Sequence, residues 1–469
     1  MNNYKNTSLW FNTMDQEPTV RNPLTSDIDA DVAIIGAGYT GLWTAYYLKS
    51  LKPELNIVIL EADIAGYGAS GRNGGWVAGF ITGLDKYVAP MPMDARRECC
   101  RVLFDNVDEI GARLQEESIN ADFNKGGVLY AAARYPEQER LQRKLLKQLY
   151  ETGHTEEDCY WLDAQQLEDK VRLRNGLGAI FKPHCATVNP ARMVRGLADA
   201  VEAMGVKIYE KTRVSAVKPR KVTTASGTVS ATTVVPALEG YSSTVSGFGR
   251  YVIPVQSLII ATEPLSDSLW DEIGLNNREA FCDGSRMVSY GQKSADGRMI
   301  FGARGGYVYG GKPRSDFSLK DEDFRIREEL MFDLFPMLKD VNITHGWGGS
   351  LGMPRNFAPH AIYDAESGIA TAGGYGGQGV APSHLFGRTL ADLILNRDTV
   401  YTQMPWAFNH APHKRVLRRW EPEPFRWITS KTIVKAFTWE ENLYQDKPGP
   451  SLGKSVANKV SDTLSLLMR

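Results

Sequence analysis

The sequence predicts an α/β protein (α+β overall) in which two domains interleave and a helical tail follows. Residues 29–63 run from an apolar stretch through a glycine turn and an apolar-periodic helix to a second apolar stretch, which is the pattern of a βαβ unit. Residues 250–310 hold several β-rich runs, which indicate a separate antiparallel sheet. The chain has 469 residues, more than one hydrophobic core usually serves, so two domains are expected.

The other elements follow from the same patterns. Residues 1–30 are polar and contain two prolines, so we expect an irregular arm. Hydrophobic spacing predicts helices over 93–118, 137–153, 190–204 and 321–334, and another that ends near Asn396. Strands are predicted over 126–132, 206–210, 213–217 and 368–373. Residues 452–468 place apolar side chains three or four apart, so we expect an amphipathic helix that packs on its own protein or on a partner subunit.

These elements give four expected regions. They are an N-terminal arm (1–30), a discontinuous dinucleotide-binding domain (31–90, 185–245 and 345–400), a substrate domain (91–184 and 246–344) and a C-terminal tail (401–469).

Composition excludes several classes of function. The formal net charge is −1, from 54 basic and 55 acidic side chains, so no general field would hold nucleic acid. Five cysteines without metal-ligand spacing predict reduced thiols, no metal site and a cytoplasmic location. A membrane partner is not expected, because no stretch approaches the roughly 20 apolar residues that cross a bilayer.

The glycine turn carries the first functional motif. Gly36, Gly38 and Gly41 form GxGxxG directly after an apolar strand, as in a Rossmann-like domain. The helix N-terminus that follows favours the negative charge of a pyrophosphate. Glu61 ends the second strand, where a carboxylate accepts hydrogen bonds from a ribose and repels the 2′-phosphate of NADP. The alternative is a glycine turn without a ligand, but it would not explain why the strand, glycine turn, helix, second strand and acidic residue follow one another in this order.

The next segment, GYGASGRNGGWVAGF (residues 66–80), has six glycines among fifteen residues. Such a loop lets the backbone lie against a flat or phosphate-bearing ligand. Arg72 within it would offer a charge-assisted hydrogen bond to phosphate.

Together these segments resemble a known family. DVAIIGAGYTGLWTAYYL followed by GASGRNGG is similar to the D-amino-acid-oxidase-like family of FAD oxidoreductases, which includes glycine and sarcosine oxidases. Residues 184–214, 373–394 and 418–428 resemble further family segments, and the last is most similar to the gamma-glutamylputrescine oxidoreductase type. The resemblance spans about residues 30 to 430. It implies FAD as cofactor and oxidation of an amine or amino acid.

The motifs and the resemblance together indicate the cofactor-binding residues. They are Gly36, Ala37, Gly38, Tyr39, Thr40, Gly41, Glu61, Ala62, Ala69, Ser70, Gly71, Arg72, Asn73, Gly74, Gly75, Trp76, Val214, Gly376, Gly377, Gln378, Gly379 and Val380. The helix that begins near Gly379 would present N–H donors and a positive dipole end to the flavin ring.

The sequence also departs from the family. Arg72-Asn73 stands where some members carry a His that attaches flavin, and no cysteine lies in the 373–380 turn, so noncovalent FAD is expected. Pro236 and Glu239 replace a run of small residues near the expected flavin edge. They either reshape the cofactor contact or end the strand early.

Substrate-side candidates are less specific. They are Trp76, Tyr290, Arg304, Trp347, His360 and Tyr375. The alternative for Tyr290 and Trp347 is a place in the core, and the alternative for Arg304 is a surface ion pair. As a site residue, Arg304 would bind a substrate carboxylate through two hydrogen bonds. No catalytic acid or base is assigned, because a neutral amine can give up a hydride without one. His184 is interpreted as a structural residue. The family resemblance implies a lysine that faces the flavin in members that use oxygen, and Lys293 is the candidate here.

The leading hypothesis is FAD-dependent oxidation of a C–N bond by hydride transfer to flavin N5. The resulting imine would hydrolyse to a carbonyl product, and O2 or another acceptor would take the electrons. One alternative is a tailoring oxidase for a larger amine-bearing metabolite. Another is an FAD-binding assembly protein without turnover, acting through a homo-oligomer formed by the C-terminal helix.

Overall fold

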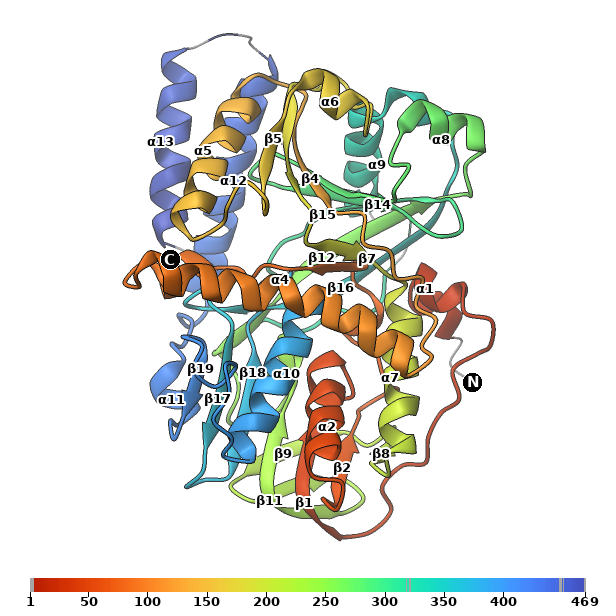
Figure 1. Ribbon diagram of the computed structural model, residues 1–469, viewed down its shortest axis with the longest axis vertical. Coiled ribbons are helices and arrows are strands. Elements are labelled where there is room, and N and C mark those ends of the chain that lie inside the picture. Colours follow the sequence, from red (N-terminus) through yellow and green to blue (C-terminus); the bar gives the residue numbers. More distant parts are fainter. Residues whose placement is uncertain (1–3, 318, 320–321, 447–448, 450, 468–469) are drawn as a thin grey trace.

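The computed structural model describes residues 4–317, 319, 322–446, 449 and 451–467, and its elements form two halves, each built on one large sheet (Figure 1). At the centre of the first sheet, β1 (Ile28–Ile35) pairs in parallel with β2 (Ile57–Leu60) and β11 (Thr228–Pro236). The last four residues of β1 are all buried, as expected for a central parallel strand covered on both faces. The strand order is β19-β17-β18-β11-β1-β2-β8, and β10 joins β9 to β11. The remaining strands are β8 (Lys207–Tyr209), β9 (Val214–Lys218), β10 (Lys221–Thr224), β17 (His360–Asp364), β18 (Ile369–Gly373) and β19 (Ala407–Asn409).

Helices cover this sheet and share one core. They are α2 (Tyr39–Leu51), α4 (Met93–Glu116), α7 (Pro190–Ala203) and α10 (Val380–Ile394). The α4 segment was expected in the substrate domain. Its buried face, with Leu103, Val107 and Ile110, instead joins the core of α2 and α10. Three short helical elements lie in the loops of this first half. They are α3 (Leu84–Val88), η2 (Ala69–Gly71) and η3 (Glu239–Thr244).

The second sheet has the order β16-β12-β15-β14-β13-β4-β6-β5, with all pairs antiparallel except β13 and β4. Its strands are β4 (Val128–Ala132), β5 (Tyr160–Leu162), β6 (Gly178–Lys182), β12 (Val252–Thr262), β13 (Ala280–Asp283), β14 (Ser289–Lys293), β15 (Met299–Arg304) and β16 (Ile343–Pro354). The domain boundary expected at residue 345 therefore falls inside β16, which pairs with β12 along its length. The helical elements of this second half are α5 (Glu137–Glu151), α6 (Ala164–Glu168), α8 (Asp267–Ile273), α9 (Glu322–Leu334) and η4 (Pro336–Leu338). A small sheet of β3 (Trp76–Ala78) and β7 (Cys185–Thr187) lies between the two halves.

The N-terminal arm is more ordered than expected. It contains η1 (Tyr4–Thr7) and α1 (Leu9–Asn12), and the Ser8 hydroxyl caps α1. Leu9, Trp10 and Phe11 are buried, and the Trp10 indole N–H donates to the Asn73 carbonyl over 2.8 Å. One short helical turn is too brief to show a periodic pattern, so the prediction of an irregular arm was wrong here.

The tail contains α11 (His413–Val416), α12 (Phe425–Asp446) and α13 (Leu452–Leu467). The prediction of α13 was confirmed, whereas α12 was not predicted. The face of α13 that packs on the protein holds Lys454, Ala457 and Ser461, while Leu452 and Val456 are 82% and 46% exposed. Within the described residues, no helix has the length and apolar character needed to cross a membrane.

Candidate functional site

A cavity of about 600 Å³ lies where the two sheets meet. One part, here called the cradle, is formed by loops at the ends of the first sheet. Its main residues are Gly36, Gly38, Tyr39, Thr40, Glu61, Ala62, Ala69, Ser70, Asn73, Val214, Glu239 and 375–380. The other part, here called the chamber, extends along the second sheet. Its residues are Trp76, Tyr130, Leu141, Gln142, Leu145, Cys282, Ser285, Arg286, Val288 and Tyr290.

The glycine turn after β1 gives the cradle its first wall. Gly36 has φ of 102°, and a Cβ there would lie 2.7 Å from the Ala237 carbonyl oxygen. Gly38 is the N-cap of α2 and offers no capping side chain. The helix therefore begins at the cavity, and its positive dipole end suits an anionic ligand.

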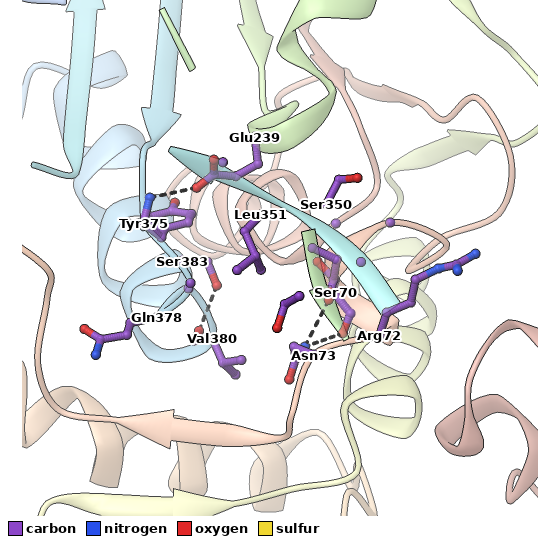
Figure 2. Close-up of a pocket in the computed structure, with 18 of the residues that line it drawn as sticks. Ser70, Arg72, Asn73, Glu239, Ser350, Leu351, Tyr375, Gln378, Val380 and Ser383 are labelled. Carbon is purple, nitrogen blue, oxygen red and sulfur yellow. Dashed lines mark hydrogen bonds between the residues drawn. The ribbon is translucent and has the colours of Figure 1, made fainter. Parts of the chain in front are cut away.

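The 66–75 loop lies against this turn. The Ser70 hydroxyl accepts the Tyr39 N–H over 3.0 Å. The Asn73 amide donates to the Ser70 carbonyl over 2.8 Å and accepts the Gly75 N–H over 2.8 Å. Ser70 and Asn73 thus line the cradle on a loop that is fixed by its own hydrogen bonds (Figure 2).

The Arg72 side chain is held by backbone carbonyls. Its guanidinium donates to the carbonyls of Tyr67, Ser315 and Gly348 over 2.7, 2.9 and 3.4 Å. Figure 2 shows it extending away from the other labelled side chains. These contacts join the loop to Ser315 and to β16. Arg72 also lines the cavity, and its expected contact with a phosphate stays a prediction.

Glu61 follows β2 and is half-buried at the cradle wall. Its carboxylate accepts the N–H groups of Ala37 and Asp63 over 2.8 and 2.9 Å. Burial raises the pKa of Glu61 to about 6. The carboxylate therefore holds the glycine turn in place, and its expected contact with a ribose stays a prediction.

A second helix N-terminus reaches the same cavity. Strand β18 leads through the 374–379 turn into α10, whose N-cap, Gly379, again has no capping side chain. The Tyr375 phenol and the Thr40 hydroxyl are 2.8 Å apart, and the Gly376 N–H donates to the Gly352 carbonyl over 3.1 Å. Tyr375 was expected on the substrate side, but its hydroxyl joins the two walls of the cradle.

Glu239 is the most unusual residue of the cradle. It begins η3, and two residues separate it from Pro236, the last residue of β11. One carboxylate oxygen accepts the Tyr375 N–H over 2.9 Å, while Oε2 is buried without a hydrogen-bond partner among the described residues. A Cβ at position 352 would lie 1.5 Å from that Oε2, so the side chain fits because residue 352 is glycine. Burial raises the pKa of Glu239 to about 7.

The chamber begins at two aromatic side chains. The rings of Trp76 and Tyr290 meet edge to face with centroids 5.8 Å apart. The Tyr290 hydroxyl and the Ser257 hydroxyl are 2.8 Å apart. The Trp76 indole N–H is buried and has no hydrogen-bond partner within the described residues.

Other substrate-side candidates lie away from the cavity lining. Trp347 is buried against Trp10 and donates its indole N–H to the Arg72 carbonyl. His360 is buried behind Gly374, and burial lowers its pKa to about 4. Both are core residues, so their assignment to the substrate side is corrected. The side chain of Arg304 lies outside the described part of the chain.

Several other expected residues support the site from behind. Ala37, Gly41, Gly71 and Gly75 are not among the lining residues. His184 stacks on Phe104 with ring centroids 4.1 Å apart, consistent with its structural reading. The Lys293 ammonium lies 4.5 Å from the centroid of the Trp270 ring, and Lys293 does not line the cavity.

Sequence reasoning missed the chamber wall formed by α5 and the β13–β14 loop. Its members are Leu141, Gln142, Leu145, Ser285, Arg286 and Val288. The apolar spacing of α5 predicted a helix but not which cavity it would face. No motif marks the loop.

Comparisons with known proteins agree with this geometry. The family model described as "FAD dependent oxidoreductase" (DAO) matches residues 31–393. The chain belongs to this family. It is 32% identical over 407 residues to the probable oxidoreductase OrdL of Haemophilus influenzae, covering 83% of this chain and 88% of that protein. It is 28% identical to the gamma-glutamylputrescine oxidoreductase of Escherichia coli, covering 83% and 89%. Glycine oxidase from Bacillus cereus has a similar fold, with a TM-score of 0.64 at 20% identity, covering 79% of this chain and 96% of that one.

The cradle of this DAO-family chain fits FAD. Two helix N-termini face one cavity, and the glycine turns leave space that side chains would fill. The N-terminus of α2 suits a pyrophosphate, and that of α10 suits the electron-rich edge of a flavin ring. The protein is therefore an FAD-dependent oxidoreductase.

Proposed function

We propose that the protein oxidises the C–N bond of an amine or amino acid bound in the chamber. Bound FAD would supply the hydride acceptor, flavin N5, and would pass the electrons to O2 or to another acceptor. The substrate would lose a hydride from the carbon beside nitrogen while the nitrogen lone pair forms the C=N bond. Water would then convert this imine to a carbonyl compound and ammonia or a smaller amine.

The observation that carries this proposal is the continuity of cradle and chamber. One cavity joins the two helix N-termini to an aromatic wall on the second sheet. A substrate beside Trp76 and Tyr290 would therefore adjoin the cofactor. The similarity to an oxidoreductase named for gamma-glutamylputrescine supports an amine as the group that is oxidised.

Residues of the chamber would bind and orient the substrate. The chamber wall includes the rings of Trp76 and Tyr290 and the apolar side chains of Leu141, Leu145 and Val288. Such surroundings disfavour a charged ammonium and so favour the neutral amine that can give up a hydride. Neither a general base nor covalent attachment of FAD is required, and noncovalent binding stays a prediction.

The test is an aerobic screen with putrescine derivatives, N-methyl amino acids, glycine and D-amino acids. We expect at least one amine to yield a carbonyl product, measured by hydrazone formation, with peroxide if O2 is the acceptor. A carbonyl product that appears only with an artificial electron acceptor would identify a dehydrogenase. If no amine in the panel gives a carbonyl product with either acceptor, the proposal fails for simple amines, and a larger amine-bearing metabolite becomes the better candidate.

A further inference from the structure

The two long tail helices pack beside the chamber. In Figure 1, α12 and α13 lie next to α5, on the same side of the second sheet. The Tyr135 and Tyr444 rings are 5.5 Å apart, and Lys454 of α13 donates to Glu137 of α5 over 2.5 Å. The tail is therefore in contact with the helix that supplies Leu141, Gln142 and Leu145 to the chamber wall.

Arg286 connects the tail to the chamber directly. It lies in the β13–β14 loop and is part of the chamber wall. Its guanidinium donates to both Glu440 oxygens, over 2.5 and 3.4 Å, and to Asp462 over 2.7 Å. Glu440 belongs to α12 and Asp462 to α13, so one side chain of the wall is held by both tail helices.

Glu440 is the centre of this contact. Its side chain is 2% exposed, and its Oε1 also accepts hydrogen bonds from the Tyr444 hydroxyl (2.9 Å) and the Asn458 amide (3.0 Å). A buried carboxylate with several donors is held in one position. Removing its charge would leave the partly buried Arg286 with only the half-exposed Asp462 as a counter-ion.

Apart from Arg286, the β13–β14 loop is held by hydrogen bonds to its own Asp283 and to α5. Asp283 accepts the Ser285 hydroxyl and the Ser289 N–H, each over 2.9 Å. Gln138 of α5 accepts the Gly284 N–H over 3.1 Å. These bonds fix both ends of the loop, whereas the wall residue between them depends on the tail.

We propose that the C-terminal helices shape the chamber through Arg286, and that Glu440 is a positioning residue that sets substrate affinity. This inference rests on the proposed function in one respect, that the chamber binds the substrate. Because Glu440 and Asp462 both bind Arg286, the tail neutralises the charge of this chamber-wall residue and fixes its side chain.

The test compares Glu440→Gln and Asp462→Asn in the FAD-loaded full-length protein. Lys459→Gln is the matched control, since it also removes one charge from an exposed position of α13. The first measurement is hydrogen–deuterium exchange of the 284–289 segment. We expect faster exchange there in both variants, no change in the control, and no change in the 36–42 segment of the cradle.

The second measurement is steady-state kinetics with an amine that the wild type oxidises. We expect KM to rise about tenfold for Glu440→Gln and about threefold for Asp462→Asn, with kcat within twofold, because binding in the chamber changes and chemistry does not. The affinity for FAD should stay the same. A purely structural role would instead lower kcat and FAD affinity together.

The outcomes separate the two proposals. Unchanged exchange of 284–289 in both variants overturns the inference, and so does an unchanged KM where exchange has risen. If Glu440→Gln does not fold, Asp462→Asn alone gives the answer, because Asp462 is half exposed. If no amine is oxidised, the proposed function fails, while the exchange experiment still tests whether the tail holds the loop.

Discussion

The Thr40 hydroxyl and the Tyr375 phenol lie 2.8 Å apart and join the first turn of α2 to the turn before α10. These two segments are more than 300 residues apart in the sequence, and each brings a helix N-terminus to the cavity. The hydrogen bond thus fixes the spacing between the two cofactor-facing helices.

Tyr375→Phe and Thr40→Val each remove this bond. A neutral buried hydrogen bond contributes about 1 kcal/mol, so we expect each variant to lower the free energy of unfolding by ~1–2 kcal/mol. Because both remove the same interaction, the double variant should cost less than the sum. Urea unfolding of the four proteins measures the coupling. Strictly additive losses would show that the two hydroxyls do not interact.

Glu239→Gln should change how stability depends on pH. Burial raises the pKa of Glu239 to about 7 from its ordinary 4.5, so between these values the folded protein keeps a proton that the unfolded chain has lost. The stability that this proton provides is complete below pH 4.5 and is lost as pH rises through 7. The variant lacks this dependence, so its stability relative to wild type should rise by up to ~3 kcal/mol between pH 4.5 and 8.

Unfolding of both apoproteins across this pH range measures the difference, in which the contributions of the other titrating groups cancel. A constant difference would mean that Glu239 is ionised in the folded protein throughout.

Gly352→Ala should disturb the cradle. The added Cβ would fall 1.5 Å from Glu239 Oε2, which must move together with its hydrogen bond to Tyr375. Overpacking of this kind costs about 1–3 kcal/mol, so FAD affinity should fall about tenfold or more. Flavin fluorescence quenching measures the affinity.

The control is Gly306→Ala, since nothing lies within 4 Å of a Cβ at that position. Gly352→Ala should also lower the FAD affinity less when it is introduced into the Glu239→Ala variant than when it is introduced into the wild type. Equal losses with and without the Glu239 side chain would contradict the steric explanation.

The motifs that bind a cofactor could be predicted from the sequence, because their geometry is local. A strand, a glycine turn and a helix place Gly36, Gly38 and Tyr39 together without help from the rest of the chain. The same holds for the turn that leads into α10. Local sequence also predicted α13 to within a residue of its observed bounds.

What could not be predicted depends on long-range packing. Arg72 was expected to donate to a phosphate, but two of its three hydrogen-bond partners come from residues more than 240 positions later. Trp347 and His360 have side chains suited to a site and lie in the core. The chamber wall combines α5 with a loop that is over a hundred residues away, and neither carries a motif.

The exposed apolar face of α13 is the candidate contact surface of the predicted homo-oligomer. Leu452, Val456 and Val460 are exposed at a spacing of four residues. If this stripe forms the subunit contact, Val456→Lys with Val460→Lys should reduce the molecular mass in sedimentation experiments to that of one chain, while FAD stays bound. A mass that is unchanged by the two substitutions would place any subunit contact elsewhere.

The central claim is that one cavity brings an amine to FAD, and anaerobic reduction of the bound flavin tests it most directly. The purified yellow protein is mixed with each amine of the panel without oxygen, and dithionite shows that the flavin is present and reducible. The account predicts that at least one amine bleaches the flavin in a single turnover and yields one equivalent of carbonyl product. Flavin that dithionite reduces but that no amine bleaches would contradict it.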